Sequence, residues 1–181
     1  MKPVCLQGYQ VVLRPLLQED LEQVRLWRND PAISQFMLSQ DEISAEQQQA
    51  WYCNIEGDDS QQHFVILYKD EPIGAANIKA RYQGQSLSEA KVVEPGLYIA
   101  NERYRNNILA FAPTLLLNDY CFDQLGVTSL VAVVKADNSA ALNYNLKLGY
   151  RIDKKGELIE ISLRKGDYQQ HSSLLKALLS R

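Results

Sequence analysis

The sequence predicts a mixed α+β fold in which helices cover both faces of a central, mostly antiparallel sheet. Two observations support this prediction. Paired apolar runs with turn residues between them occur in the first and last parts of the chain, and they indicate antiparallel hairpins. In the second half, helical and strand-like segments alternate. The 181 residues contain no internal repeat, low-complexity tract or linker, so we expect residues 1–181 to form a single domain.

Composition excludes several classes of protein. The hydrophobic fraction of 46% and the charged fraction of 23% are ordinary for a globular domain. A net charge of −3 and scattered Lys and Arg residues argue against a nucleic-acid-binding surface. No apolar run is long enough for a signal peptide or a membrane span, so we expect a cytoplasmic protein. Cys5, Cys53 and Cys121 lie far apart without a neighbouring His, which predicts buried thiols and no metal site.

Local signals place the elements of the first half. Alternation of β-branched residues predicts an opening strand, which Pro15 ends. Apolar residues at helical spacing predict the next helix, which Pro31 separates from a second, short helix. Ser44 and Gln47 have the spacing of a capping box, which marks the start of a third helix. The predicted elements are a strand at 9–16, helices at 21–29, after 31 and at 45–55, and a hairpin at 63–82.

Prolines and a glycine set the boundaries in the second half. Pro95 lacks an N–H for a sheet ladder, so the next strand should begin at about Gly96. Pro113 is tolerated only in the first turn of a helix, so that helix should start near Ala110 or be kinked. Gly149 fits the left-handed end of the helix that follows. The predicted elements are helices at 109–125 and 140–148, a strand at 130–136, a hairpin at 150–170 and a short helix at 172–181.

Two helix starts in this region carry polar groups. Residues 104–110 follow a strand and open a helix, so free backbone N–H groups and the positive end of the helix dipole converge there. Such a place suits a pyrophosphate, although a loop-to-helix junction can also exist without binding an anion. Asn138 ends the strand LVAVVKADN and precedes small residues, which is typical of a helix N-cap.

Three segments in this order resemble the GCN5-related N-acetyltransferase (GNAT) family: EPGLYIANERYRNNILA (94–110), LVAVVKADNSAA (130–141) and LNYNLKLGY (142–150). The resemblance implies a sheet splayed between two neighbouring strands, acetyl-CoA bound there as co-substrate, and direct acetyl transfer to an amine. Ile108 stands in the place of the family's principal glycine, and Asn106 in that of a further one. The implied cofactor-binding residues are Tyr98, Ile99 and Ala100 for the pantetheine arm, Arg105, Asn106, Asn107, Ile108, Leu109 and Ala110 for the pyrophosphate, and Asn138.

The resemblance also implies two catalytic candidates. Acetyl transfer requires a neutral amine and a proton for the departing thiolate. Glu94 matches an acidic position of the family and is the candidate base, with a surface carboxylate as the alternative. The family's proton-donating Tyr is replaced by Asn145, and the neighbouring Tyr144 is the candidate in its place. One residue is about 100° of helix rotation, so Tyr144 has packing as its alternative role.

The acceptor side is suggested by the opening of the chain. The phrases LRPL and WRND, followed by Met37, resemble family members that acetylate nucleotide-linked 4-amino sugars in the pseudaminic acid pathway. The implied substrate-binding residues are Trp27, Arg28, Asn29 and Met37, although Trp27 also suits a core and Arg28 a helix C-terminus.

The sequence leaves two rival functions open: acetylation of protein N-termini of the ribosomal type, and a degenerate, non-catalytic ligand-binding module. The family often pairs through a sheet edge or the C-terminal hairpin, so a homodimer is an expected assembly. His63 and His171 have no Ser, Cys or carboxylate partner at a telling spacing, so we expect neither a catalytic triad nor a metal site at these residues.

Overall fold

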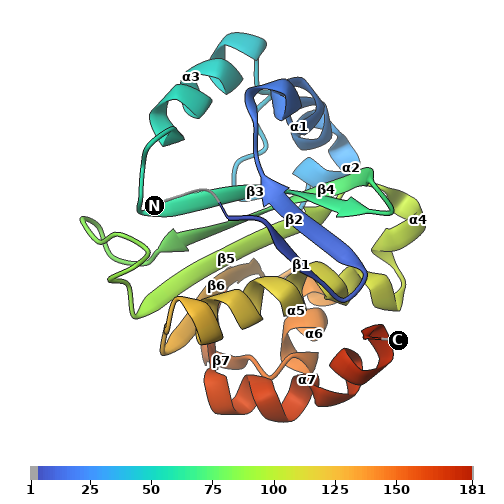
Figure 1. The fold of residues 1–181 in the computed structure, drawn as a ribbon, viewed down its shortest axis with the longest axis vertical. Coiled ribbons are helices and arrows are strands. Elements are labelled where there is room, and N and C mark those ends of the chain that lie inside the picture. Colours follow the sequence, from blue (N-terminus) through green and yellow to red (C-terminus); the bar gives the residue numbers. More distant parts are fainter. Residues whose placement is uncertain (1–3, 181) are drawn as a thin grey trace.

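The computed structural model describes residues 4–180, which form one mixed eight-stranded sheet with helices on both faces (Figure 1). Strands pair in the order β1-β2-β3-β4-β5-β6-β8-β7, and every pairing is antiparallel except that between β5 and β6. The predicted α+β class and mostly antiparallel sheet are therefore confirmed. The strands are β1 Leu6–Gly8, β2 Val11–Pro15, β3 Gln61–Tyr68, β4 Glu71–Ala80, β5 Val92–Ile99, β6 Ser129–Lys135, β7 Arg151–Lys154 and β8 Leu158–Arg164.

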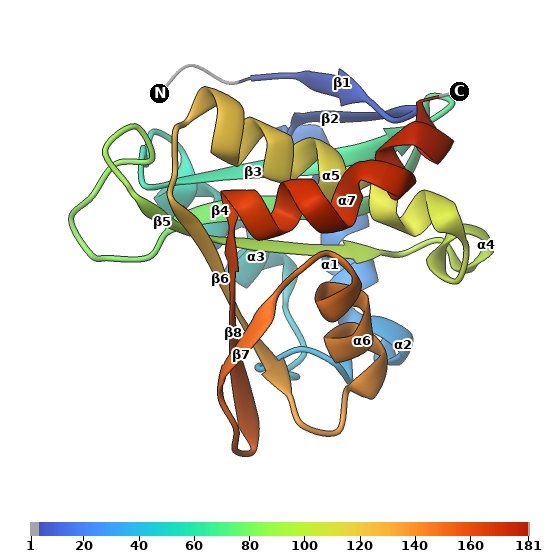
Figure 2. The same cartoon turned by 90° about the horizontal axis from the view of Figure 1, so that it is seen from below.

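Each face of the sheet has its own helical cover (Figures 1 and 2). In β3, Phe64 and Ile66 join the larger core cluster with residues of α5 and α7, whereas Val65 points to a smaller cluster with α1 and α3. The alternation of β3 therefore separates two packed layers. The helices are α1 Leu21–Asn29, α2 Pro31–Ser34, α3 Ala45–Ile55, α4 Glu102–Arg105, α5 Ala112–Asp119, α6 Ser139–Lys147 and α7 Lys165–Leu179, with single turns at Gln18–Asp20, Ile108–Phe111 and Tyr120–Gln124.

The central sheet opens between β5 and β6. These strands pair only at Val92 with Ser129 and at Val93 with Leu130, and then diverge (Figure 2). The predicted start of β5 at Gly96 is wrong, because Pro95 lies inside the strand. The carbonyl of Lys91 faces β6, where it accepts from the Thr128 N–H. The main-chain groups of successive residues in β5 point alternately toward β6 and toward β4. The missing N–H of Pro95 therefore falls on the opened side, where no ladder needs it.

Several local predictions are confirmed. α1 and α3 have the predicted bounds, and Ser44 and Gln47 form the predicted capping box. Pro113 lies in the first turn of α5, after a separate turn at Ile108–Phe111. The left-handed conformation predicted for Gly149 is present, with φ of 99°.

Two further predictions, on the C-terminal segment and on the cysteines, are wrong. The C-terminal hairpin ends at Arg164, and the following residues form a 15-residue helix, α7, in place of a strand and a short helix. Tyr168, Ser172 and Leu179 of α7 are buried, so tertiary packing decides this segment over local strand propensity. Cys5 and Cys53 are exposed, whereas Cys121 is buried as predicted.

Candidate functional site

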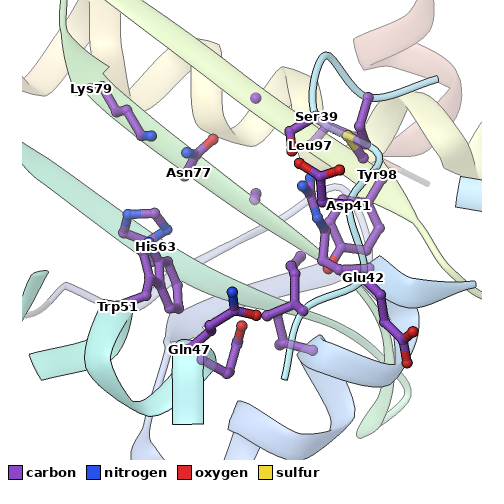
Figure 3. A pocket seen from close by; sticks show the side chains of 18 residues that line it. Ser39, Asp41, Glu42, Gln47, Trp51, His63, Asn77, Lys79, Leu97 and Tyr98 are labelled. Carbon is purple, nitrogen blue, oxygen red and sulfur yellow. The ribbon is translucent and has the colours of Figure 1, made fainter. Parts of the chain in front are cut away.

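A cavity of about 650 Å³ lies on the face of the sheet that α1 and α3 cover (Figure 3). Strands β3, β4 and β5 form its floor, and the loop before α3 forms one wall. Its volume is in the range that small-molecule sites occupy. The lining residues are Val24, Arg28, Met37, Ser39, Asp41, Glu42, Ile43, Gln47, Gln48, Trp51, His63, Ala75, Ala76, Asn77, Lys79, Gly96, Leu97 and Tyr98.

A row of three residues crosses the cavity floor. His63 of β3 pairs with Asn77 of β4, which pairs with Gly96 of β5. A Cβ added to Gly96 would lie 2.6 Å from the Asn77 side-chain oxygen, so the glycine leaves room for that amide. The row extends from the α3 side of the cavity to the strand that borders the gap with β6.

His63 is held from two sides. Its Nε2 lies 2.9 Å from Oε1 of Gln61, and its ring meets Trp51 edge-on with centroids 5.0 Å apart. Burial, and secondarily the positive charge of Lys79, lower the pKa of His63 to about 4. The imidazole is therefore neutral near pH 7.

Tyr98 forms the opposite side of the cavity. Its hydroxyl is buried and makes no hydrogen bond among residues 4–180, and burial raises its pKa. The ring contacts Trp27 edge-on at 6.4 Å between centroids. Trp27, predicted as a substrate-binding residue, therefore supports Tyr98 and is not one of the cavity-lining residues.

The other predicted acceptor-side residues have distinct positions. Arg28 and Met37 line the cavity. Asn29 does not line it, but its side chain accepts from the Ile43 N–H and donates to the Ile43 carbonyl, each at 2.9 Å. Asn29 therefore fixes the loop that forms the cavity wall.

The predicted phosphate loop follows β5 and presents backbone amides. The N–H groups of Asn106, Asn107 and Ile108 make no hydrogen bond among the described residues. The Leu109 N–H is capped by the Asn107 side chain at 2.8 Å, and the Ala110 N–H donates to the Asn107 carbonyl. Three neighbouring free amides match the acceptor oxygens of a pyrophosphate, so the loop fits that group.

The backbone of this loop accommodates Ile108 in an ordinary conformation. No residue from Asn106 to Ala110 has positive φ, so the conformation does not require a glycine. Ile108 is 44% exposed. Arg105 is directed away from the amides, since its guanidinium donates to the carbonyls of Ile99 and Ala100. It braces the loop against the end of β5.

The opened edge of β5 provides further backbone groups. By alternation from Lys91, the main-chain groups of Leu97 and Ile99 face the gap, whereas those of Tyr98 face β4. The Ile99 carbonyl already accepts from Arg105, and the Ala100 N–H donates to Ile73. Leu97, which is not among the residues predicted from the sequence, therefore has main-chain groups that face the gap.

α6 approaches the loop from the far side of the gap. Asn138 caps α6 by accepting from the Ala141 N–H at 3.1 Å. Tyr144 donates to the Ala110 carbonyl at 3.0 Å, contacts Thr114, and stacks on Phe111 with centroids 4.4 Å apart. Burial raises the pKa of Tyr144. Its hydroxyl is thus engaged in fixing α6 to the loop.

Glu94 lies inside β5, in register with Lys79 of the cavity wall. Its carboxylate forms an ion pair with Arg81 at 3.3 Å, and both side chains are more than a third exposed.

Residues 4–180 contain no cluster of His, Cys, Asp or Glu arranged for a metal ion. In the same range, no helix is both long and apolar enough to cross a membrane.

Sequence comparisons agree with this geometry. A family model described as an acetyltransferase (GNAT) domain matches residues 10–151. Spermidine N(1)-acetyltransferase of Escherichia coli K12 is 24% identical over 162 residues, which cover 90% of this chain and 83% of that protein. Acetyltransferase PseH of Campylobacter jejuni (strain 81-176) is 25% identical over 153 residues, which cover 84% of this chain and 90% of PseH.

Solved structures share the fold over almost the whole chain. Apo FdhC, described as a nucleotide-linked sugar GNAT, has a TM-score of 0.79 at 21% identity, covering 99% of this chain and 100% of that one. A spermidine N-acetyltransferase from Vibrio cholerae, in complex with CoA and spermine, has a TM-score of 0.74 at 18% identity. That match covers 89% of this chain and 99% of the other.

Proposed function

Because the chain belongs to the GNAT acetyltransferase family and is an N-acetyltransferase with acetyl-CoA as co-substrate, we propose that its acceptor is a nucleotide-linked amino sugar. The observation that carries this proposal is the cavity of about 650 Å³ beside β5. It is large enough for a small molecule and borders the strand whose other edge lines the gap with β6.

The donor side is assigned to backbone groups. The free amides of Asn106, Asn107 and Ile108 would hold the pyrophosphate, and the main chain of Leu97 would pair with the pantetheine arm. When bound, acetyl-CoA would supply a thioester, so that the C–N bond to its carbonyl carbon forms as the C–S bond breaks and the CoA thiolate leaves. Asn138 caps α6, and Tyr144 fixes that helix to the loop, so we assign Tyr144 the packing role.

Proton removal from the amine is assigned to Glu94. This residue shares a strand with Gly96 and Tyr98 of the cavity, and alternation places all three on the same face. Its carboxylate is paired with Arg81 at 3.3 Å. Glu94→Gln should lower kcat more than it changes KM for either substrate.

An amino sugar on a nucleotide is favoured by the charges of the cavity. Arg28 and Lys79 supply cationic groups for phosphate, while Asp41 and Glu42 supply carboxylates for the ammonium of the incoming amine. PseH and the sugar GNAT FdhC are among the proteins that resemble this chain. The exposed, free thiols of Cys5 and Cys53 fit a reducing cytoplasm.

A polyamine is the second candidate acceptor, since Asp41 and Glu42 line the cavity and one relative is a spermidine acetyltransferase. A panel that measures release of free CoA separates the candidates. It should contain a UDP-linked 4-amino-4,6-dideoxyhexose, spermidine, kanamycin and a peptide with a free N-terminus. We expect the highest kcat/KM with the sugar nucleotide. A higher kcat/KM for spermidine or the peptide would contradict the proposal.

A further inference from the structure

His63 lies at the end of the cavity remote from the gap. It is two strands from β5, because it pairs with Asn77 and Asn77 pairs with Gly96. Neighbouring strands are about 4.8 Å apart, so His63 lies roughly 10 Å from Gly96 across the sheet. An acceptor that fills the cavity with its amine toward β5 would therefore place a non-reacting part beside His63.

Two neighbours fix which nitrogen of His63 carries the proton. The Gln61 side-chain amide donates through Nε2 to the carboxylate of Asp58, so its oxygen faces His63. An amide oxygen can only accept, and His63 Nε2 must therefore be the N–H that donates to it. Nδ1 then carries a lone pair, and it makes no hydrogen bond among residues 4–180.

The charges around His63 favour a neutral ligand group. The imidazole is uncharged near pH 7, since its pKa is lowered to about 4. Lys79 lies on the same side of the cavity as His63, whereas Asp41 and Glu42 lie on the opposite side (Figure 3). Arg28 is the other cation in the lining. An ammonium beside His63 would meet the charge of Lys79, and the nearest carboxylate, that of Asp58, is already bound by the Gln61 amide.

We infer that His63 is a specificity-determining residue whose Nδ1 accepts a hydrogen bond from a neutral O–H or N–H group of the acceptor. This inference rests on the proposed function and sharpens it. The remote part of the acceptor carries a sugar hydroxyl or a nucleobase N–H, and a molecule that places a second ammonium there is disfavoured. Gln61 and Asp58 act as positioning residues, because they hold the ring in the Nε2–H form.

The protonation state can be measured without any acceptor. Nitrogen-15 NMR of the imidazole rings distinguishes the two neutral forms, and the exposed His171 provides an internal reference in the same spectrum. We expect His63 in the Nε2–H form from pH 6 to 8. An Nδ1–H ring, or a ring that is cationic at pH 7, would overturn the inference.

The ligand group can be identified by combining enzyme variants with altered acceptors. The probe is the UDP-linked 4-amino-4,6-dideoxyhexose, compared with its 2-deoxy, 3-deoxy and N3-methyluracil analogues. For the wild type, kcat/KM should fall about tenfold with one analogue, as expected for one buried hydrogen-bond group left unpaired. His63→Phe should have a kcat/KM about tenfold below that of the wild type with the parent probe. With that same analogue, the kcat/KM of His63→Phe should not fall further.

Two further variants complete the test. Gln61→Glu should also weaken the reaction, because a carboxylate at this position favours a cationic His63 that cannot accept. His171→Phe is the matched control and should behave as the wild type. The inference would be overturned if each of the three analogues lowered the kcat/KM of His63→Phe by the same factor as that of the wild type. If the wild type acetylates no sugar nucleotide, the proposed acceptor class fails, and the NMR result alone decides the assignment of His63.

Discussion

The two sides of the site are built in different ways. The proposed donor side consists of main-chain groups from one continuous stretch, residues 97–110. The proposed acceptor side is the cavity, which is lined by residues from β3, β4, β5, α1, α3 and the loop before α3. Backbone conformation should therefore control acetyl-CoA binding, and side-chain identity should control the choice of acceptor. Substitutions that change only one of these properties can separate the two sides.

The largest effect on stability is expected at the contact of β4 with β5, because β5 borders both sides of the site. A Cβ at Gly74 would lie 2.1 Å from the carbonyl oxygen of Tyr98, so Gly74→Ala must push β4 and β5 apart. We expect a loss of about 3 kcal/mol or more in the free energy of unfolding, measured in urea. Gly166→Ala is a control for the change of residue type, because a Cβ at Gly166 meets no atom within 4 Å and the φ of Gly166 is not positive. Equal losses in the two variants would show that the strand contact is unimportant.

A smaller effect is expected from pH on the acceptor side. The pKa of His63 is lowered to about 4 by burial, against about 6.5 in an unfolded chain. Between these values the unfolded chain binds a proton that the folded chain does not, so lowering the pH through this window reduces stability. We expect a loss of roughly 2 kcal/mol from pH 6.5 to 4, allowing for partial solvent access.

Urea unfolding at several pH values measures this slope. His63→Phe should remove most of it, while Asp58, which faces the same network, has a lowered pKa and titrates below the window. A slope that is unchanged in His63→Phe would contradict the burial of this imidazole. His171→Phe should retain the slope of the wild type.

The smallest effect concerns the contact between α6 and the donor loop. Tyr144→Phe removes the hydrogen bonds to Ala110 and Thr114 but keeps the stacking on Phe111. We expect a loss of about 1 kcal/mol in stability and nearly unchanged kcat at saturating substrates. A fall in kcat of a hundredfold or more, without a matching loss of stability, would instead identify Tyr144 as a proton donor.

The elements that carry the proposed donor side were largely predictable from sequence because their signals are local. A strand, a loop and a helix start follow one another in 94–110, and the N-cap of Asn138 depends on its immediate neighbours. The start of β5 was missed because Pro95 is tolerated only where β6 has already diverged. That divergence is a property of the folded sheet and leaves no mark in the segment itself.

The acceptor side was predicted only at α1 and Met37. Arg28 and Met37 line the cavity, but His63, Asn77, Lys79 and Trp51 were not selected. Their proximity depends on strand register and on helix packing, which bring together residues far apart in sequence. The spacing from Gln61 to His63, two residues in a strand, was the one local signal available, since such residues share a face.

The most direct test of the backbone account compares two substitutions at Ile108. Asn107 has φ of −124° and ψ of 175°, which a following proline permits, and Ile108 is the first residue of its turn, where proline is tolerated. Ile108→Pro therefore removes a free N–H, whereas Ile108→Gly keeps it. In calorimetric titration with acetyl-CoA, we predict about tenfold weaker binding for Ile108→Pro and wild-type or tighter binding for Ile108→Gly. Unchanged affinity in the proline variant, or a large loss in the glycine variant, would contradict the assignment of this loop.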